Sequence, residues 1–110
     1  MIVRYALFEG SVKINEVPAF RRFVKENLVP LWKQFDGAEG VRVSFGETRD
    51  DGAPEFPLIL AISYADLDAM QCALACPARE ESRIVTAEML EKYFEGRIHH
   101  HVTSTEDYPV

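Results

Sequence analysis

Residues 57–64 read Pro-Leu-Ile-Leu-Ala-Ile-Ser-Tyr, and this stretch decides the fold of the chain. It is a short apolar run bounded by turn residues, which is typical of a β-strand. Leu58 and Leu60 point to one side of such a strand. Ile59 and Ala61 point to the other. A strand with two apolar faces belongs in a sheet that is covered on both faces.

Three more strands are expected around this one. They are Ile2–Phe8, the strictly alternating Val41–Phe45, and Ile98–Thr103. The Glu9–Ser11 segment is expected to break the first of them, and Gly96 is expected to stop the helix that precedes the last.

Two helical segments separate the strands. Asn15 is suited to cap the first, in which apolar residues recur at three- and four-residue steps. Pro30 lies inside it and lacks an N–H, which predicts a kink or break. Asp66 is expected to cap the second segment. Pro77 interrupts and restarts this segment, which continues to about Tyr93.

The order β-α-β-β-α-β predicts one α+β domain over residues 1–110, with a polar tail at 104–110. It is the ferredoxin-like pattern, an antiparallel four-stranded sheet with both helices on one face. Two helices cover only one face of the sheet, yet its strands are apolar on both. The simplest cover for the second face is another copy of the chain, which predicts a C2 homodimer.

Composition restricts the class of protein. The net charge is −6, and no basic stripe or tail offers a surface for nucleic acid or an anionic membrane. No stretch is long enough to span a bilayer, and the first residues lack the zones of a signal peptide. Cys72 and Cys76 are expected to be free thiols in a reducing cytoplasm. We therefore expect a cytoplasmic protein without a nucleic-acid or membrane partner.

All three histidines of the chain follow one another in the last predicted strand. Strand parity sends His99 and His101 to the open sheet face and His100 to the core side. His99 and His101 could share a metal ion, but the spacing places no third ligand, so no metal is expected. The alternative to a functional role is that these residues are the polar surface of an edge strand, where they prevent edge-to-edge pairing.

Two arginines and a serine are expected beside His99 and His101. Arg42 and Ser44 alternate with apolar residues that suit the helix side, and Arg4 is the residue of the first strand least able to enter a core. A histidine can move a proton, and an arginine can bind a carboxylate or stabilise an oxyanion. These residue types predict His99, His101 and Arg42 as catalytic groups. Arg4 and Ser44 are predicted to bind the substrate, a small organic acid or aromatic molecule.

Two aromatic residues complete the candidate set. Trp32 and Tyr64 could line a ligand pocket, or they could belong to the core or to a dimer interface, since aromatic residues dominate both.

Several short motifs resemble those of a known family. They are Phe20–Phe23, Glu26–Leu31, Ala73–Pro77, and Tyr93–Gly96 leading into the histidines. They resemble the EthD family, linked to bacterial degradation of ethyl tert-butyl ether, within the dimeric α+β barrel superfamily. The resemblance implies a homodimer with a small-molecule cavity that acts in catabolic or secondary metabolism.

One position departs from that family's pattern. The family typically has His-x-Pro-Leu, whereas here Asn27 stands nearest to Pro30, one residue further away. An amide can hydrogen-bond but cannot accept a proton near neutral pH, so Asn27 is expected only to bind substrate.

The resemblance leaves two function classes open. One is an enzyme without an obligatory cofactor, of monooxygenase, decarboxylase or cyclase type. The other is a non-catalytic ligand-binding or accessory protein that carries a metabolite or haem. Fold alone does not choose between them.

Overall fold

The computed structural model describes all 110 residues, in which four antiparallel strands form one sheet. The strands are β1 (Ile2–Val12), β2 (Gly40–Phe45), β3 (Leu58–Tyr64) and β4 (Phe94–Ser104). Their spatial order is β2-β3-β1-β4, so β2 and β4 are the edges. The predicted ferredoxin-like order of elements is confirmed.

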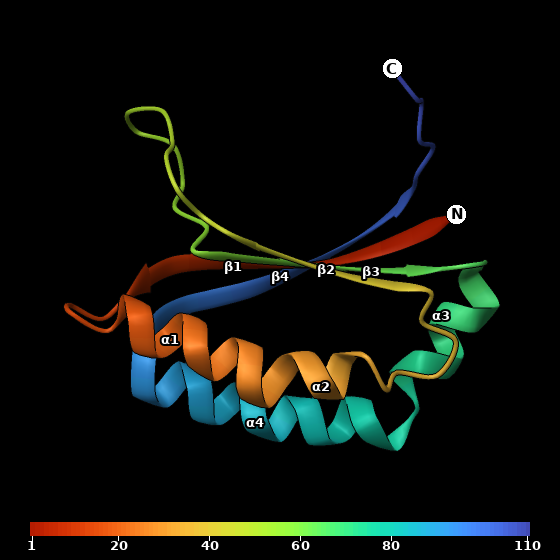
Figure 1. Ribbon diagram of the computed structural model, residues 1–110, viewed down its shortest axis with the longest axis horizontal. Coiled ribbons are helices and arrows are strands. Elements are labelled where there is room, and N and C mark those ends of the chain that lie inside the picture. The colour runs from red at the N-terminus through yellow and green to blue at the C-terminus, as the bar shows by residue number, and fades with distance from the viewer.

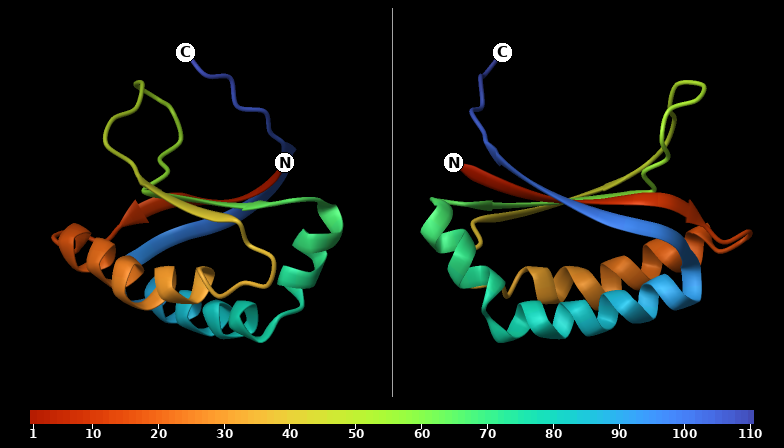
Figure 2. Two further views of the ribbon diagram at one scale, coloured as in Figure 1. Left: turned by 45° about the vertical axis from the view of Figure 1, so that its right-hand side comes forward. Right: turned by 180° about the vertical axis from the view of Figure 1, so that it is seen from behind.

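The helices form a layer on one side of the sheet. They are α1 (Val17–Phe23), the π-helical turn η1 (Val24–Leu28), α2 (Val29–Trp32), α3 (Leu67–Leu74) and α4 (Pro77–Tyr93). Figures 1 and 2 show this layer beneath the sheet, while the loop at residues 46–57 and the C-terminal segment rise on the opposite side. None of the helices is both long and apolar enough to cross a membrane.

The strand register assigns each residue to one face of the sheet. Ala6 pairs with Leu60 on the face that packs against the helices, which we call the helix face. Leu7 pairs with Ile59 on the other face, which we call the open face. The core cluster lies between the helix face and the helices, whereas Val3 is buried on the open face. Leu7 and Ile59 remain only partly buried, so the apolar open face has no cover within one chain.

The segment around Gly10 does not break the first strand, and Gly96 is not the residue that stops the helix before the last strand. Contrary to the sequence prediction, β1 continues to Val12, and β4 begins at Phe94, directly after α4. Gly10 and Gly96 lie opposite each other in these two strands, with φ of 150° and 154°. A Cβ on either residue would overlap the backbone of the facing strand. The two glycines therefore permit a close backbone approach, which is another use of glycine within strands.

The predicted kink at Pro30 takes the form of a π-helical turn. The five residues Val24–Leu28 form η1, and the chain continues directly into α2. Because Pro30 has no N–H and crowds the preceding turn, one wider turn accommodates it without ending the helical segment.

The helix starts agree with the sequence at two positions and differ at one. The Asp66 side chain caps α3 by accepting a hydrogen bond from the Ala69 N–H at 2.8 Å, and Pro77 begins α4, as predicted. The predicted cap at Asn15 is wrong, since Glu16 takes the N-cap position of α1. Asn15 instead adopts the left-handed conformation, with φ of 64°, which asparagine tolerates better than most residues.

Candidate functional site

A cavity of about 270 Å³ lies between α4 and the helix face of the sheet. Ten of its sixteen lining residues are hydrophobic, so its wall is apolar with a few polar groups, as in typical small-molecule sites. One side of α4 contributes residues spaced by three or four, and the sheet and the end of the first helical segment contribute the rest. The lining residues are Arg4, Ala6, Phe8, Trp32, Phe35, Leu60, Ile62, Tyr64, Arg79, Ser82, Arg83, Thr86, Ala87, Leu90, Ile98 and His100.

Two buried polar groups on this wall have no partner within the chain. Tyr64 is 1% exposed and Trp32 is 3% exposed, yet neither the phenol nor the indole N–H forms a hydrogen bond. Every side-chain polar atom that is wholly shielded from solvent does have a partner. The polar atoms of Tyr64 and Trp32 therefore each keep a small solvent-accessible area, and both residues line the cavity. Buried polar groups are nearly always paired, so unpaired ones on a cavity wall indicate a place for a ligand.

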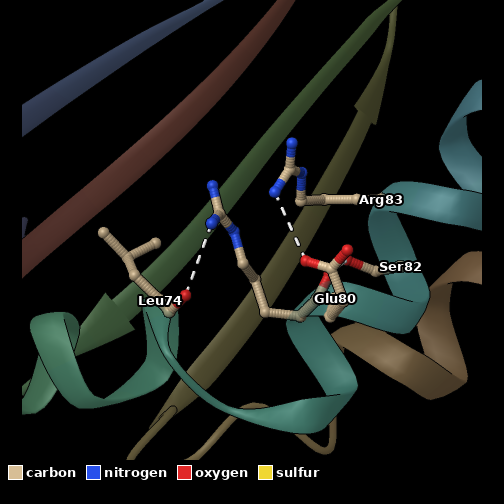
Figure 3. A network of polar contacts seen from close by, with 5 residues as sticks. Leu74, Glu80, Ser82 and Arg83 are labelled. Atoms are coloured by element: carbon tan, nitrogen blue, oxygen red, sulfur yellow. Dashed lines mark hydrogen bonds and ion pairs between the residues drawn. The ribbon is translucent and has the colours of Figure 1, made fainter.

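The charged groups of the cavity are all basic. None of the lining residues is Asp or Glu, although the chain contains 18 acidic residues. Arg83 pairs with Glu80 at 3.3 Å, and Arg79 donates a hydrogen bond to the Leu74 carbonyl oxygen at 3.3 Å. Figure 3 draws both contacts as dashed lines. Arg4 has no carboxylate partner. Burial, followed by the positive charge of Arg79, lowers the pKa of Arg4.

Two further groups are suited to proton transfer. Burial, followed by the charges of Arg4 and Arg79, lowers the pKa of His100, although the residue as a whole is exposed. Burial raises the pKa of the Tyr64 phenol, and the charge of Arg4 opposes this. At neutral pH the cavity therefore presents a neutral imidazole that can accept a proton and a protonated phenol that can donate one.

We expect His100 to titrate below the ordinary histidine pKa of about 6.5. Because the pKa is lower in the folded chain, the unfolded chain binds more protons as the pH falls through about 6.5, and stability decreases. Above that pH this destabilisation is absent. His100→Gln should therefore lose less unfolding free energy than the wild type between pH 7 and pH 5, measured by urea unfolding. An NMR titration midpoint for the His100 ring at or above 6.5 would contradict the expected shift.

The predicted parity of the histidines is confirmed. His99 and His101 lie opposite Leu7 and Tyr5 on the open face, and His100 lies on the helix face. Arg42 and Ser44 also lie on the open face, as predicted, opposite Ala61 and Ile59.

The predicted placement of Arg4 on the open face is wrong. Arg4 alternates with Val3 and pairs with Ile62, so it lies on the helix face and lines the cavity. Strand parity decides its direction, and the cavity provides the space that a guanidinium would lack in a filled core.

The open-face candidates do not converge within one chain. Arg42 is on edge strand β2 and His101 on the opposite edge strand β4, three strand spacings or about 14 Å apart. The His99 Nε2 lies 2.7 Å from the Glu9 Oε1, and Arg97 lies 3.5 Å from the same oxygen. The hydrogen bond from His99 is the main reason that the pKa of Glu9 is lowered.

A second hollow, of about 370 Å³, lies on the open face. Arg42, Ser44 and Tyr5 line it, but His99 and His101 do not. No three His, Cys, Asp or Glu side chains in the structure lie together as a metal site would require.

Of the remaining predicted substrate-binding residues, two line the cavity and one does not. Trp32 and Tyr64 both line the cavity. Asn27 is exposed on η1, donates a hydrogen bond to the Phe23 carbonyl oxygen at 3.3 Å, and lines neither the cavity nor the open-face hollow.

Sequence reasoning did not single out Arg79, and it gave His100 no functional role. A signal for Arg79 exists in the sequence. Arg79, Ser82 and Thr86 follow one side of α4 at three- and four-residue steps, together with the apolar Leu90. Polar residues on the side of a helix that faces a sheet indicate a cavity where a filled core would be expected.

The fold matches solved structures over almost the whole chain. An ethyl tert-butyl ether D (EthD) family protein from Bacillus halodurans has a TM-score of 0.77 and 18% identity, covering 96% of this chain and 99% of that one. A dimeric protein of unknown function and ferredoxin-like fold from Bacteroides fragilis has a TM-score of 0.65 and 14% identity, covering 94% and 95%. An antibiotic biosynthesis monooxygenase has a TM-score of 0.63 and 13% identity, covering 97% and 100%.

No protein-family model matches the sequence, and no curated protein does. The structural matches are all below 20% identity, so they establish the ferredoxin-like fold. This is the fold implied by the resemblance of the sequence motifs to the EthD family.

Proposed function

We propose that this chain binds a small organic acid or aromatic molecule in the cavity between α4 and the sheet. The observation that carries this proposal is the pair of polar groups without a hydrogen-bond partner on Tyr64 and Trp32, two almost fully buried residues that line the cavity. A ligand in that position would satisfy hydrogen-bonding groups that no part of the chain satisfies.

The same cavity supports acid–base chemistry without an obligatory cofactor. His100 is held in its neutral form by burial and by two arginines, so it is the proton acceptor of the proposed site. Tyr64 stays protonated and is the donor or the orienting group. A proton acceptor beside cationic groups suits reactions that build negative charge on the substrate, such as the monooxygenase, decarboxylase or cyclase types of the superfamily.

A non-catalytic carrier of a metabolite or haem is the second candidate. Asn27, which stands nearest to the position of the family histidine, lies outside the cavity and cannot accept a proton. Native mass spectrometry of freshly purified protein separates the two classes. A retained haem supports the carrier, whereas a retained organic molecule that the protein converts supports the enzyme.

Blocking the cavity is expected to abolish binding. Ala87 is exposed on α4 and lines the cavity, so Ala87→Trp fills its mouth without disturbing the core. We expect at least about tenfold weaker binding of aromatic fragments in ligand-observed NMR, because the bulky ring takes the space that encloses the ligand. Ile84→Trp is the matched control, because Ile84 is on the same helix, 66% exposed and outside the cavity. Equal binding by both variants would contradict the proposal.

The open face offers the other candidate site, with His99, His101 and Arg42 as proposed catalytic groups and Ser44 as a binding group. The support for this site is that all four residues lie on the open face, the side of the sheet away from the helices. If fragments still bind to Ala87→Trp but are lost from His101→Ala or Arg42→Ala, the open face holds the ligand.

We also propose that two copies pack through their open faces to form a homodimer in the cytoplasm. The partly buried apolar residues of β1 and β3 on this face need a cover, and a second identical face is self-complementary. The free thiols Cys72 and Cys76 are compatible with a reducing compartment.

A further inference from the structure

Arg4 and Arg79 face the same cavity with no carboxylate between them. Arg4 projects from β1 and Arg79 from the first turns of α4, and neither forms an ion pair within the chain. Arg79 donates to one carbonyl oxygen, that of Leu74, and Arg4 has no hydrogen-bond partner. Two like charges that are partly withdrawn from water repel each other, and an anion placed between them would remove that repulsion.

The surroundings specify what kind of anion fits. Arg83 is already paired with Glu80, and most of the remaining wall is apolar, including Trp32, Phe35 and Leu90. A ligand with a single charged end therefore fits this cavity. Tyr64 lines the same cavity and its hydroxyl has no partner within the chain, so a hydrogen-bond donor is available to the ligand. Arginine binds carboxylates through paired, charge-assisted hydrogen bonds.

We propose that Arg4 and Arg79 form an anion-binding end of the cavity and that the ligand is an aromatic carboxylate. This inference rests on the proposed function, because the carboxylate is one end of the molecule that the cavity encloses. The aromatic body lies against Trp32 and Phe35, and the carboxylate lies between the two guanidinium groups. His100, on the neighbouring strand, is then beside the charged end of the ligand.

The test compares 2-naphthoate with 2-naphthamide, which has the same ring system and a neutral amide in place of the carboxylate. Calorimetry at pH 8 is expected to show the carboxylate binding about tenfold or more tightly than the amide. Arg4→Met and Arg79→Met keep most of the apolar stem and remove the charge. Each variant should weaken 2-naphthoate binding about tenfold and leave 2-naphthamide within about threefold of wild type. Arg22→Met, at an exposed position of α1 outside the cavity, is the charge-matched control.

A second readout uses the wild type alone and does not depend on the variants folding. A bound carboxylate beside His100 favours the imidazolium, so 2-naphthoate should raise the NMR titration midpoint of His100. The neutral amide should leave it unchanged.

The outcomes separate this inference from the proposed function. Equal affinity for the two compounds, or a carboxylate preference that persists in both arginine variants, would overturn the anion-binding end while the cavity remains a binding site. Binding of neither compound by folded wild-type protein would overturn both.

Discussion

The substitution Leu7→Asp is expected to convert the proposed homodimer to monomers. Leu7 lies in the middle of the open face, next to Ile59 and His99 in the register. A twofold interface holds two copies of each residue, and an unpaired buried carboxylate costs roughly 3–5 kcal/mol. Two copies would weaken the dimer by about 6–10 kcal/mol, which is more than roughly ten-thousandfold in the dissociation constant. Light scattering coupled to size exclusion measures the resulting mass directly.

The control for this substitution is Ile84→Asp. Ile84 is apolar and 66% exposed, but it lies on α4 in the helix layer, away from the open face. It should leave the mass unchanged. A Leu7→Asp protein that stays dimeric at micromolar concentration would show that the open face is not the interface.

Gly96→Ala is expected to lower the free energy of unfolding by about 3–4 kcal/mol. Gly96 has φ of 154°, and a Cβ there would overlap the carbonyl oxygen of Glu9 on β1. Since that atom belongs to the backbone of a paired strand, the strands must separate to admit a methyl group. Urea unfolding of the two proteins gives the difference.

Gly52→Ala separates backbone strain from the steric overlap. Gly52 also has a positive φ, 81°, but a Cβ there would meet nothing within 4 Å. It should cost only about 1–2 kcal/mol, the usual penalty for a left-handed residue. If both substitutions lowered the free energy of unfolding equally, Gly96 would not be required for the close approach of β1 and β4.

The fold could be predicted because its signals are local and repeated. Alternation indicates β2, and an apolar run indicates β3. Pro30 indicates the irregular turn in the first helical segment, and Pro77 indicates the start of α4. Gly10 and Gly96 could not be interpreted in the same way. A glycine that ends a strand or a helix and one that admits a facing backbone look alike in sequence, and only the pairing of Gly10 with Gly96 distinguishes them.

The site was predicted less completely, for a physical reason. Sequence patterns predict which face a side chain takes, and parity was right for His99, His100 and His101. Parity alone places Arg4 on the helix face. The prediction from sequence assigns it to the open face, because a charged side chain is not expected in a core. That expectation fails where the core contains a cavity, and no local pattern in β1 reveals one. The cavity depends on how α4 packs over the sheet, which brings Arg79 to residues far from it in sequence.

The location of the bound ligand tests the central claim most directly, and amide chemical-shift mapping with 2-naphthoate measures it. The proposed site predicts the largest shifts on one side of α4, around Arg79 and Thr86, and at His100 on β4. Shifts centred on Arg42, Ser44 and Ile59, which line the open-face hollow, would contradict the claim that the cavity between α4 and the sheet holds the ligand.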